Sequence, residues 1–181
     1  MFWLSTSTVV RLRDKLRAAG QKASVEVRPP NEPLSEDDLA VVEAEYAPFC
    51  EAMYLMMSAD GEVSVEEREV LAGAMRNLSG NVVDGDLVER LVTLAERNAN
   101  REGREARLKS VVADLSKDPA RAEVAFVLAA AIAFADNTIA DEENETLDAL
   151  AEGLGIDENR ADDLLQAIEK DLGGPPPPLP G

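Results

Sequence analysis

The sequence reads DGEVSVEE at residues 60–67, and a related stretch, DNTIADEE, follows at residues 136–143. The two copies are offset by 76 residues (136 − 60), and aligning residues 59–71 with residues 135–147 leaves six of thirteen positions identical. Each copy follows an apolar run with helical spacing and opens a second amphipathic run. A duplicated helix–acidic turn–helix unit is therefore the feature from which the fold is predicted.

Apolar residues recur at helical spacing through residues 35–172, and no stretch alternates as a strand would. Capping signals such as Ser35, Ser64 and Pro119 mark helix starts, and Pro48 predicts a kink or a fresh start in the first helix. The pattern predicts an all-α fold, a compact bundle of about seven to eight helices built from two repeated helix–acidic turn–helix halves. The nearly all-apolar residues 124–135 are too few to span a bilayer, so we expect them to form the central buried helix.

Two tails flank this domain. Residues 1–34 form a basic amphipathic segment and linker, and residues 173–181 form a Pro-rich tail. The positive charges of residues 1–30 follow the apolar run, which is not the order of a secretory signal. The alternatives are an interfacial helix on an anionic membrane, a terminal helix docked on the body, or a flexible tail. The Pro-rich tail is expected to be a stiff, solvated terminus, and docking in an aromatic groove of a partner is the alternative.

The charge balance excludes several classes of protein. The net charge is −18, and since residues 1–30 carry +4, the rest carries −22 (−18 − 4). Such a body repels phosphate backbones, so we expect no nucleic-acid binding, and cations or basic surfaces are the natural partners. The chain has no His and only Cys50 as a thiol, which excludes His-based catalysis, structural zinc and internal disulfides. Cys50 is expected to be a small core residue rather than a reactive thiol.

The acidic turns are candidate cation sites, because each places carboxylates at the end of one helix and in the first turn of the next. The candidate ligands are Asp60, Glu62, Glu67, Asp136 and Glu143. A site made of oxygen ligands suits Ca²⁺ or Mg²⁺ rather than zinc or copper. The spacing is shorter than that of an EF-hand loop.

The two turns also allow an interpretation without metal. Ser64 and Glu67 have the spacing of a capping box, in which both side chains satisfy backbone N–H groups. The second copy has Ala140, which cannot cap, and Thr138 in place of Glu62, so its site is expected to be the weaker one. Asp60 at the negative end of a helix favours a nearby cation or donor. Both interpretations stay open at this point.

The doubled acidic turn, together with Leu147, Leu150-Ala151 and Leu154-Gly155-Ile156, resembles the TerB family of tellurite-resistance proteins over residues 35–172. The resemblance implies two four-helix halves, an acidic surface associated with divalent metal, and a role in tellurite and general envelope stress. It also implies a membrane-associated protein partner of the same resistance system, and a cytoplasmic location at the inner face of the membrane. Related domains in a co-chaperone share the turn.

We therefore expect a non-enzymatic acidic adaptor that binds Ca²⁺ or a similar cation and acts with a membrane-associated partner. The alternative is a metal-free, co-chaperone-like interaction module. An enzyme that uses paired carboxylates is disfavoured, because no nucleophile, His or phosphate-binding glycine loop accompanies them. Direct reduction of tellurite is disfavoured too, since one buried thiol is a poor source of electrons.

Overall fold

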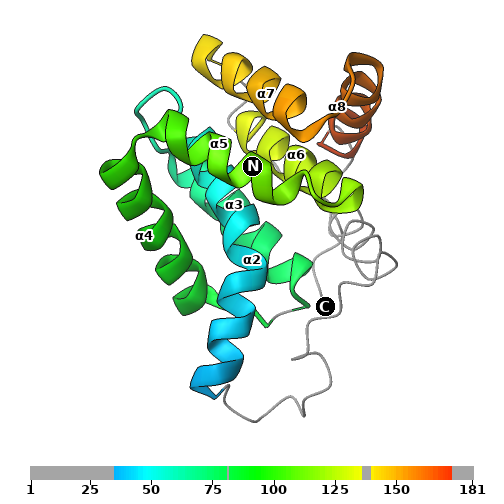
Figure 1. Ribbon diagram of the computed structural model, residues 1–181. Coiled ribbons are helices and arrows are strands. Elements are labelled where there is room, and N and C mark those ends of the chain that lie inside the picture. Colours follow the sequence, from blue (N-terminus) through cyan, green and yellow to red (C-terminus); the bar gives the residue numbers. More distant parts are fainter. Residues whose placement is uncertain (1–34, 81, 136–139, 173–181) are drawn as a thin grey trace.

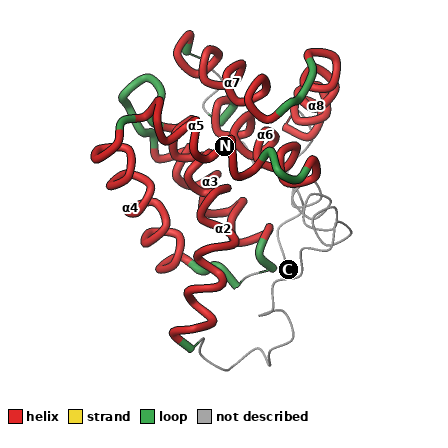
Figure 2. Tube along the Cα trace, viewed as in Figure 1, coloured by secondary structure: helices red, strands yellow, loops and turns green. Residues whose placement is uncertain are grey.

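The structure is a computed structural model that describes residues 35–80, 82–135 and 140–172. These residues form seven helices and no strand (Figures 1 and 2). The helices are α2 (Glu36–Met57), α3 (Val65–Leu78), α4 (Gly85–Glu102), α5 (Arg104–Leu115), α6 (Pro119–Ala133), α7 (Asp141–Leu154) and α8 (Glu158–Leu172). The all-α prediction is confirmed. The segments predicted as tails, residues 1–34 and 173–181, lie outside the described residues.

Most of these helices begin next to a residue whose side chain accepts a hydrogen bond from one of the first backbone N–H groups of the helix. Ser35 accepts from the N–H of Asp38 at the start of α2, and the Asp38 carboxylate accepts from the Ser35 N–H in return. Asp118 plays the same part at α6, where Pro119 takes the first helical position. Gly155, at φ +72°, ends α7 in the left-handed conformation that glycine adopts without strain. Local chemistry therefore places these ends.

Helix α2 runs without interruption through Pro48, where the sequence predicted a kink or a fresh start. Proline has no N–H, so the carbonyl of Ala44 lacks the donor that residue 48 would otherwise supply. Tertiary packing compensates, because the half of α2 that follows Pro48 is buried at every position from Phe49 to Met57. The lost hydrogen bond is thus tolerated on the exposed side of the helix.

Helices α2 and α6 form the centre of the domain. Every residue of α6 from Val124 to Ala133 is buried, which confirms the prediction of a central apolar helix. Helix α2 packs mainly against α4 and α6, and α6 packs mainly against α2 and α7. The large core side chains Phe49 and Phe126 are almost fully covered. The two copies of the repeat therefore share one core.

The remaining helices cover this centre from different sides. In Figure 1, α4 lies alongside α2, whereas α7 and α8 lie across α6 at the opposite side of the domain. Helix α5 joins the halves and contacts both α2 and α7. Within the described residues, no helix combines the length and the apolar character needed to cross a membrane.

Candidate functional site

The first acidic turn, residues 58–67, is here called the first corner. Its end is fixed by a complete capping box: the N–H of Glu67 donates to Ser64 Oγ at 3.1 Å, and the N–H of Ser64 donates to Glu67 Oε2 at 2.7 Å. Glu67 is buried although it carries a carboxylate. A buried charge needs hydrogen bonds, and the helix N-terminus provides them. Glu67 therefore holds the corner together.

Asp60 and Glu62 are placed differently in the same corner. Both are exposed, and the N–H of Glu62 donates to Asp60 Oδ1 at 2.9 Å. Gly61 between them has φ +84°, so the tight turn requires a residue without a Cβ. The backbone donor stabilises the Asp60 carboxylate, which the sequence left without a partner at the end of a helix.

The second corner, residues 134–143, is only partly described, and Asp136 lies outside the described residues. Glu143 is buried like Glu67, and its Oε2 accepts from the N–H of Ala140 at 2.8 Å. Ala140 has no side-chain oxygen, so the side-chain half of the capping box is missing, and the N–H of Glu143 donates instead to the Ala140 carbonyl at 3.1 Å. The glutamate thus keeps the same position in both corners, with or without a hydroxyl partner.

The predicted ligands are not gathered into a preformed metal centre within the described residues. No group of three or more acidic or thiol side chains there has the geometry to hold an ion. Asp60 and Glu62 lie on the surface, and Glu67 turns one oxygen toward the backbone at Ser64. The first corner therefore offers two exposed carboxylates beside one buried carboxylate.

The half-formed capping box predicts a stabilising substitution. Replacing Ala140 with serine should raise the free energy of unfolding by about 0.5–1 kcal/mol, because Ser Oγ can take over the N–H of Glu143, which otherwise donates to the Ala140 carbonyl at 3.1 Å. The opposite change, Ser64→Ala, should lower it by about the same amount. Urea denaturation followed by circular dichroism measures both. If Ala140→Ser left the unfolding midpoint unchanged, the two corners would not be equivalent in their capping.

Arg104 links the first corner to α5. It is the first residue of α5, and its guanidinium donates to the carbonyl of Leu55 in the last turn of α2. No basic residue lies in the last turn of α2 itself, so Arg104 supplies the positive charge that a helix C-terminus favours. The position of the first corner therefore depends on α5 as well as on α2.

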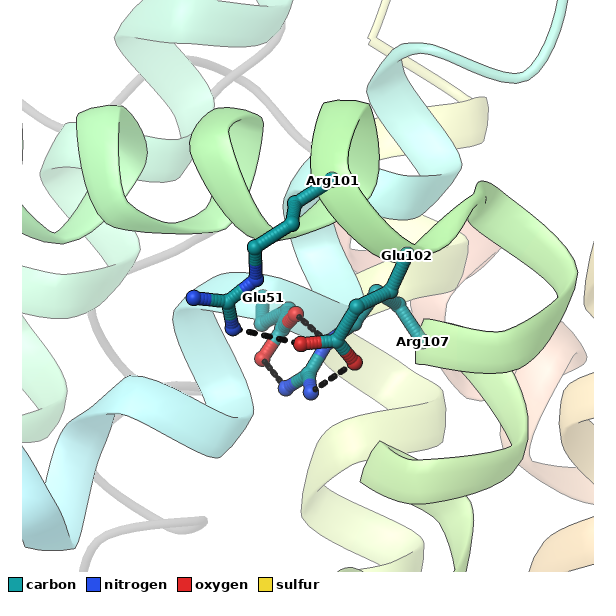
Figure 3. A network of polar contacts seen from close by, with 4 residues as sticks. All are labelled: Glu51, Arg101, Glu102 and Arg107. Carbon is teal, nitrogen blue, oxygen red and sulfur yellow. Dashed lines mark hydrogen bonds and ion pairs between the residues drawn. The ribbon is translucent and has the colours of Figure 1, made fainter.

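A network of ion pairs lies one turn further along α5, on the same face toward α2 (Figure 3). Arg107 binds Glu51 with two hydrogen bonds, Nε to Oε1 at 2.7 Å and Nη2 to Oε2 at 2.9 Å. Its Nη1 also donates to Glu102 at 3.0 Å, and Glu102 accepts from Arg101 as well. The hydrogen bonds to Glu51 raise the pKa of Arg107 above its ordinary value, so the guanidinium stays charged.

The sequence alone does not predict this network. Glu51 and Arg107 are 56 residues apart, and no local spacing connects them. One signal was present: Glu51 stands between Cys50 and Ala52 in an apolar helical run. An acidic residue on such a face needs a cationic partner when the helix is buried.

Cys50 is fully buried, as predicted, and burial raises the pKa of its thiol from 9.0 to about 12, with smaller contributions from Glu51 and Glu89. The thiolate is the reactive form of cysteine. This thiol is therefore a core group and not a nucleophile.

The exposed face of α7 is strongly acidic. No basic residue occurs between Asp141 and Leu154. The acidic residues exposed on this helix are Asp141, Glu142, Glu145, Asp148 and Glu152. None of these five forms an ion pair within the described part of the chain, which leaves their charge available to cations or to a basic surface.

Comparison with known proteins supports the family that the sequence suggested. No curated protein and no solved structure matches the chain. The family model described as tellurite resistance protein TerB matches residues 49–170, about two thirds of the chain, including both corners, the network around Arg107 and the acidic face of α7. The chain belongs to the TerB family.

Proposed function

We propose that this protein is a non-enzymatic acidic adaptor in a tellurite or envelope stress response, and that it binds a hard divalent cation such as Ca²⁺ at its corners. Membership of the TerB family supports the link to tellurite resistance. The observation that carries the proposal is the pair of exposed carboxylates of Asp60 and Glu62, which have no cationic partner among the described residues. A cation would supply the missing positive charge.

The distribution of charge supports the adaptor role. The acidic face of α7 is unpaired, and a basic surface of a membrane-associated partner would be complementary to it. The chain has no His, and its single thiol is buried, so the groups that most often act as base or nucleophile are missing. Binding, rather than catalysis, is the activity that this set of side chains supports best.

A metal-free interaction module is the second candidate. It is favoured by the hydrogen bonds from the backbone to Glu67 and Glu143, which give both buried glutamates a capping role that needs no ion. In this case the corners position α3 and α7, and recognition depends on the helix surfaces alone. The two candidates differ in whether the corners bind cations.

Calorimetric titration of CaCl₂ and MgCl₂ into the full chain distinguishes these two functions. The test variant is Asp60→Asn/Glu62→Gln, which removes the two exposed carboxylates and leaves the capping box intact. The matched control is Glu66→Gln/Glu69→Gln, which removes the same charge from the adjacent exposed positions of α3. We expect weak binding, with a dissociation constant of about 10⁻⁴–10⁻³ M, in the parent and the control.

The stoichiometry separates the two corners. If both bind, the test variant should lose one of two ions and retain the site at the second corner. If only the first corner binds, the test variant should show no heat. Silence of the parent at millimolar cation would remove the metal function and leave the metal-free module. An equal loss of binding heat in the test variant and in the control would mean that the ion is attracted by the overall negative charge and is not bound at the first corner.

A further inference from the structure

Two open hollows lie next to each other on the face formed by α2, α4 and α5. The first has a volume of about 390 Å³ between Glu43 of α2 and the middle of α4. The second, of about 500 Å³, lies between α2, the end of α4 and α5. Leu94 lines both hollows, so it stands on the ridge that separates them. Its side chain is large and apolar, yet Leu94 is 40% exposed.

The second hollow exists because α2 has small side chains and a proline where it faces α5. Ala44, Ala47 and Pro48 form its wall on α2, and their spacing places them on one side of that helix. The carbonyl of Ala44, which Pro48 leaves without its helical donor, belongs to the same wall. The face thus offers an apolar ridge beside an apolar wall.

The charges around the hollows are balanced, in contrast to the rest of the body. Four acidic and four basic residues line the two hollows. The acidic residues are Glu43, Glu51, Glu89 and Asp114, and the basic residues are Arg90, Arg97, Arg107 and Lys117. All four acidic residues already pair with basic neighbours: Glu43 with Arg90, Glu51 with Arg107, Asp114 with Lys117, and Glu89 with Arg68 of α3. A second molecule can approach this face without meeting the net repulsion that a body of charge −22 imposes elsewhere.

We infer that this face is the interface between two copies of the chain related by a two-fold axis. Leu94 of one copy inserts into a hollow of the second copy, next to the Leu94 of that second copy, and the reverse contact forms in the same way. A two-fold interface needs a surface that is complementary to itself, and a ridge next to a hollow together with a balanced set of charges meets that requirement. A strongly acidic or basic partner would instead require an excess of the opposite charge around the hollows.

Sedimentation velocity of the full chain at two salt concentrations tests this inference. Raising NaCl from about 0.1 M to about 1 M shortens the Debye length from about 10 Å to about 3 Å. This screens the repulsion between two molecules of charge −18, so the dimer should become tighter. Leu94→Glu should raise the dissociation constant about a hundredfold or more, because it buries two unpaired carboxylates in the interface.

The matched control is Val65→Glu. Val65 is another exposed apolar residue, 67% exposed at the start of α3, and it lines neither hollow. The Val65→Glu variant should therefore dimerise with the same dissociation constant as the parent. A monomer at both salt concentrations, or a dimer that Leu94→Glu does not weaken, would overturn the inference.

A different occupant would give a different result. If residues 1–30 of the same chain filled the hollows, the protein would be a monomer and the methyl NMR signals of Leu94 would shift in a Trp3→Ala variant. That outcome would also overturn the dimer.

Discussion

Replacing Arg107 with methionine should lower the free energy of unfolding by about 3–5 kcal/mol, the usual consequence of removing one partner from a buried ion pair. The Glu51 side chain is only 9% exposed and that of Arg107 17%, so water can replace little of the lost interaction. For a domain of this size the unfolding temperature should fall by about 10 °C or more. Thermal unfolding followed by circular dichroism measures the change.

Two further variants identify the cause. Arg101→Met removes a charge from the same network, but the Arg101 side chain is 67% exposed, so it should cost less than about 1 kcal/mol. Glu51→Leu/Arg107→Met removes both buried charges and should recover most of the loss. If Arg107→Met were no more harmful than Arg101→Met, the buried pair would contribute no stability. If the double variant were as unstable as the single one, packing and not charge would explain the loss.

The thiol of Cys50 should react with a disulfide reagent such as DTNB about a thousandfold more slowly in the folded chain than in the unfolded chain, from the thiolate fraction alone. The reason is the rise of its pKa from 9.0 to about 12 on burial, and steric protection will slow the reaction further. The rate of absorbance change with and without guanidinium chloride measures the ratio. Rapid labelling of the native chain would show that the helix face around Cys50 opens.

The same shift predicts how stability depends on alkaline pH. The folded state holds the Cys50 proton more tightly than the unfolded state, so this stabilisation is fully present below pH 9 and is lost as the pH rises toward about 12. A Cys50→Ala variant should lose less stability over this range than the parent.

The sequence was sufficient for the features that depend on local chemistry. The all-α fold, the central position of residues 124–133 and the capping box of Ser64 with Glu67 all follow from helical spacing and from residues adjacent in the chain. The break between α4 and α5 has no side-chain cap, and it falls at Gly103, where φ is +88°.

The features that depend on distant parts of the chain were not predictable in the same way. Nothing in the spacing connects Arg104 to the end of α2 or Arg107 to Glu51, because these contacts form only when the halves pack together. In the first corner the N–H of Glu62 donates to Asp60 Oδ1, a contact that the spacing of the carboxylates alone does not predict. In a short turn the backbone N–H groups compete with a cation for the carboxylate oxygens, and the spacing of the carboxylates does not reveal this competition.

The packing of α2 against α6 makes the two copies of the repeat depend on each other. Each of these helices covers the other, so a fragment that held only one copy would leave its longest apolar helix in contact with water. Cutting the chain between α4 and α5 should therefore yield two pieces that fold only when they are mixed.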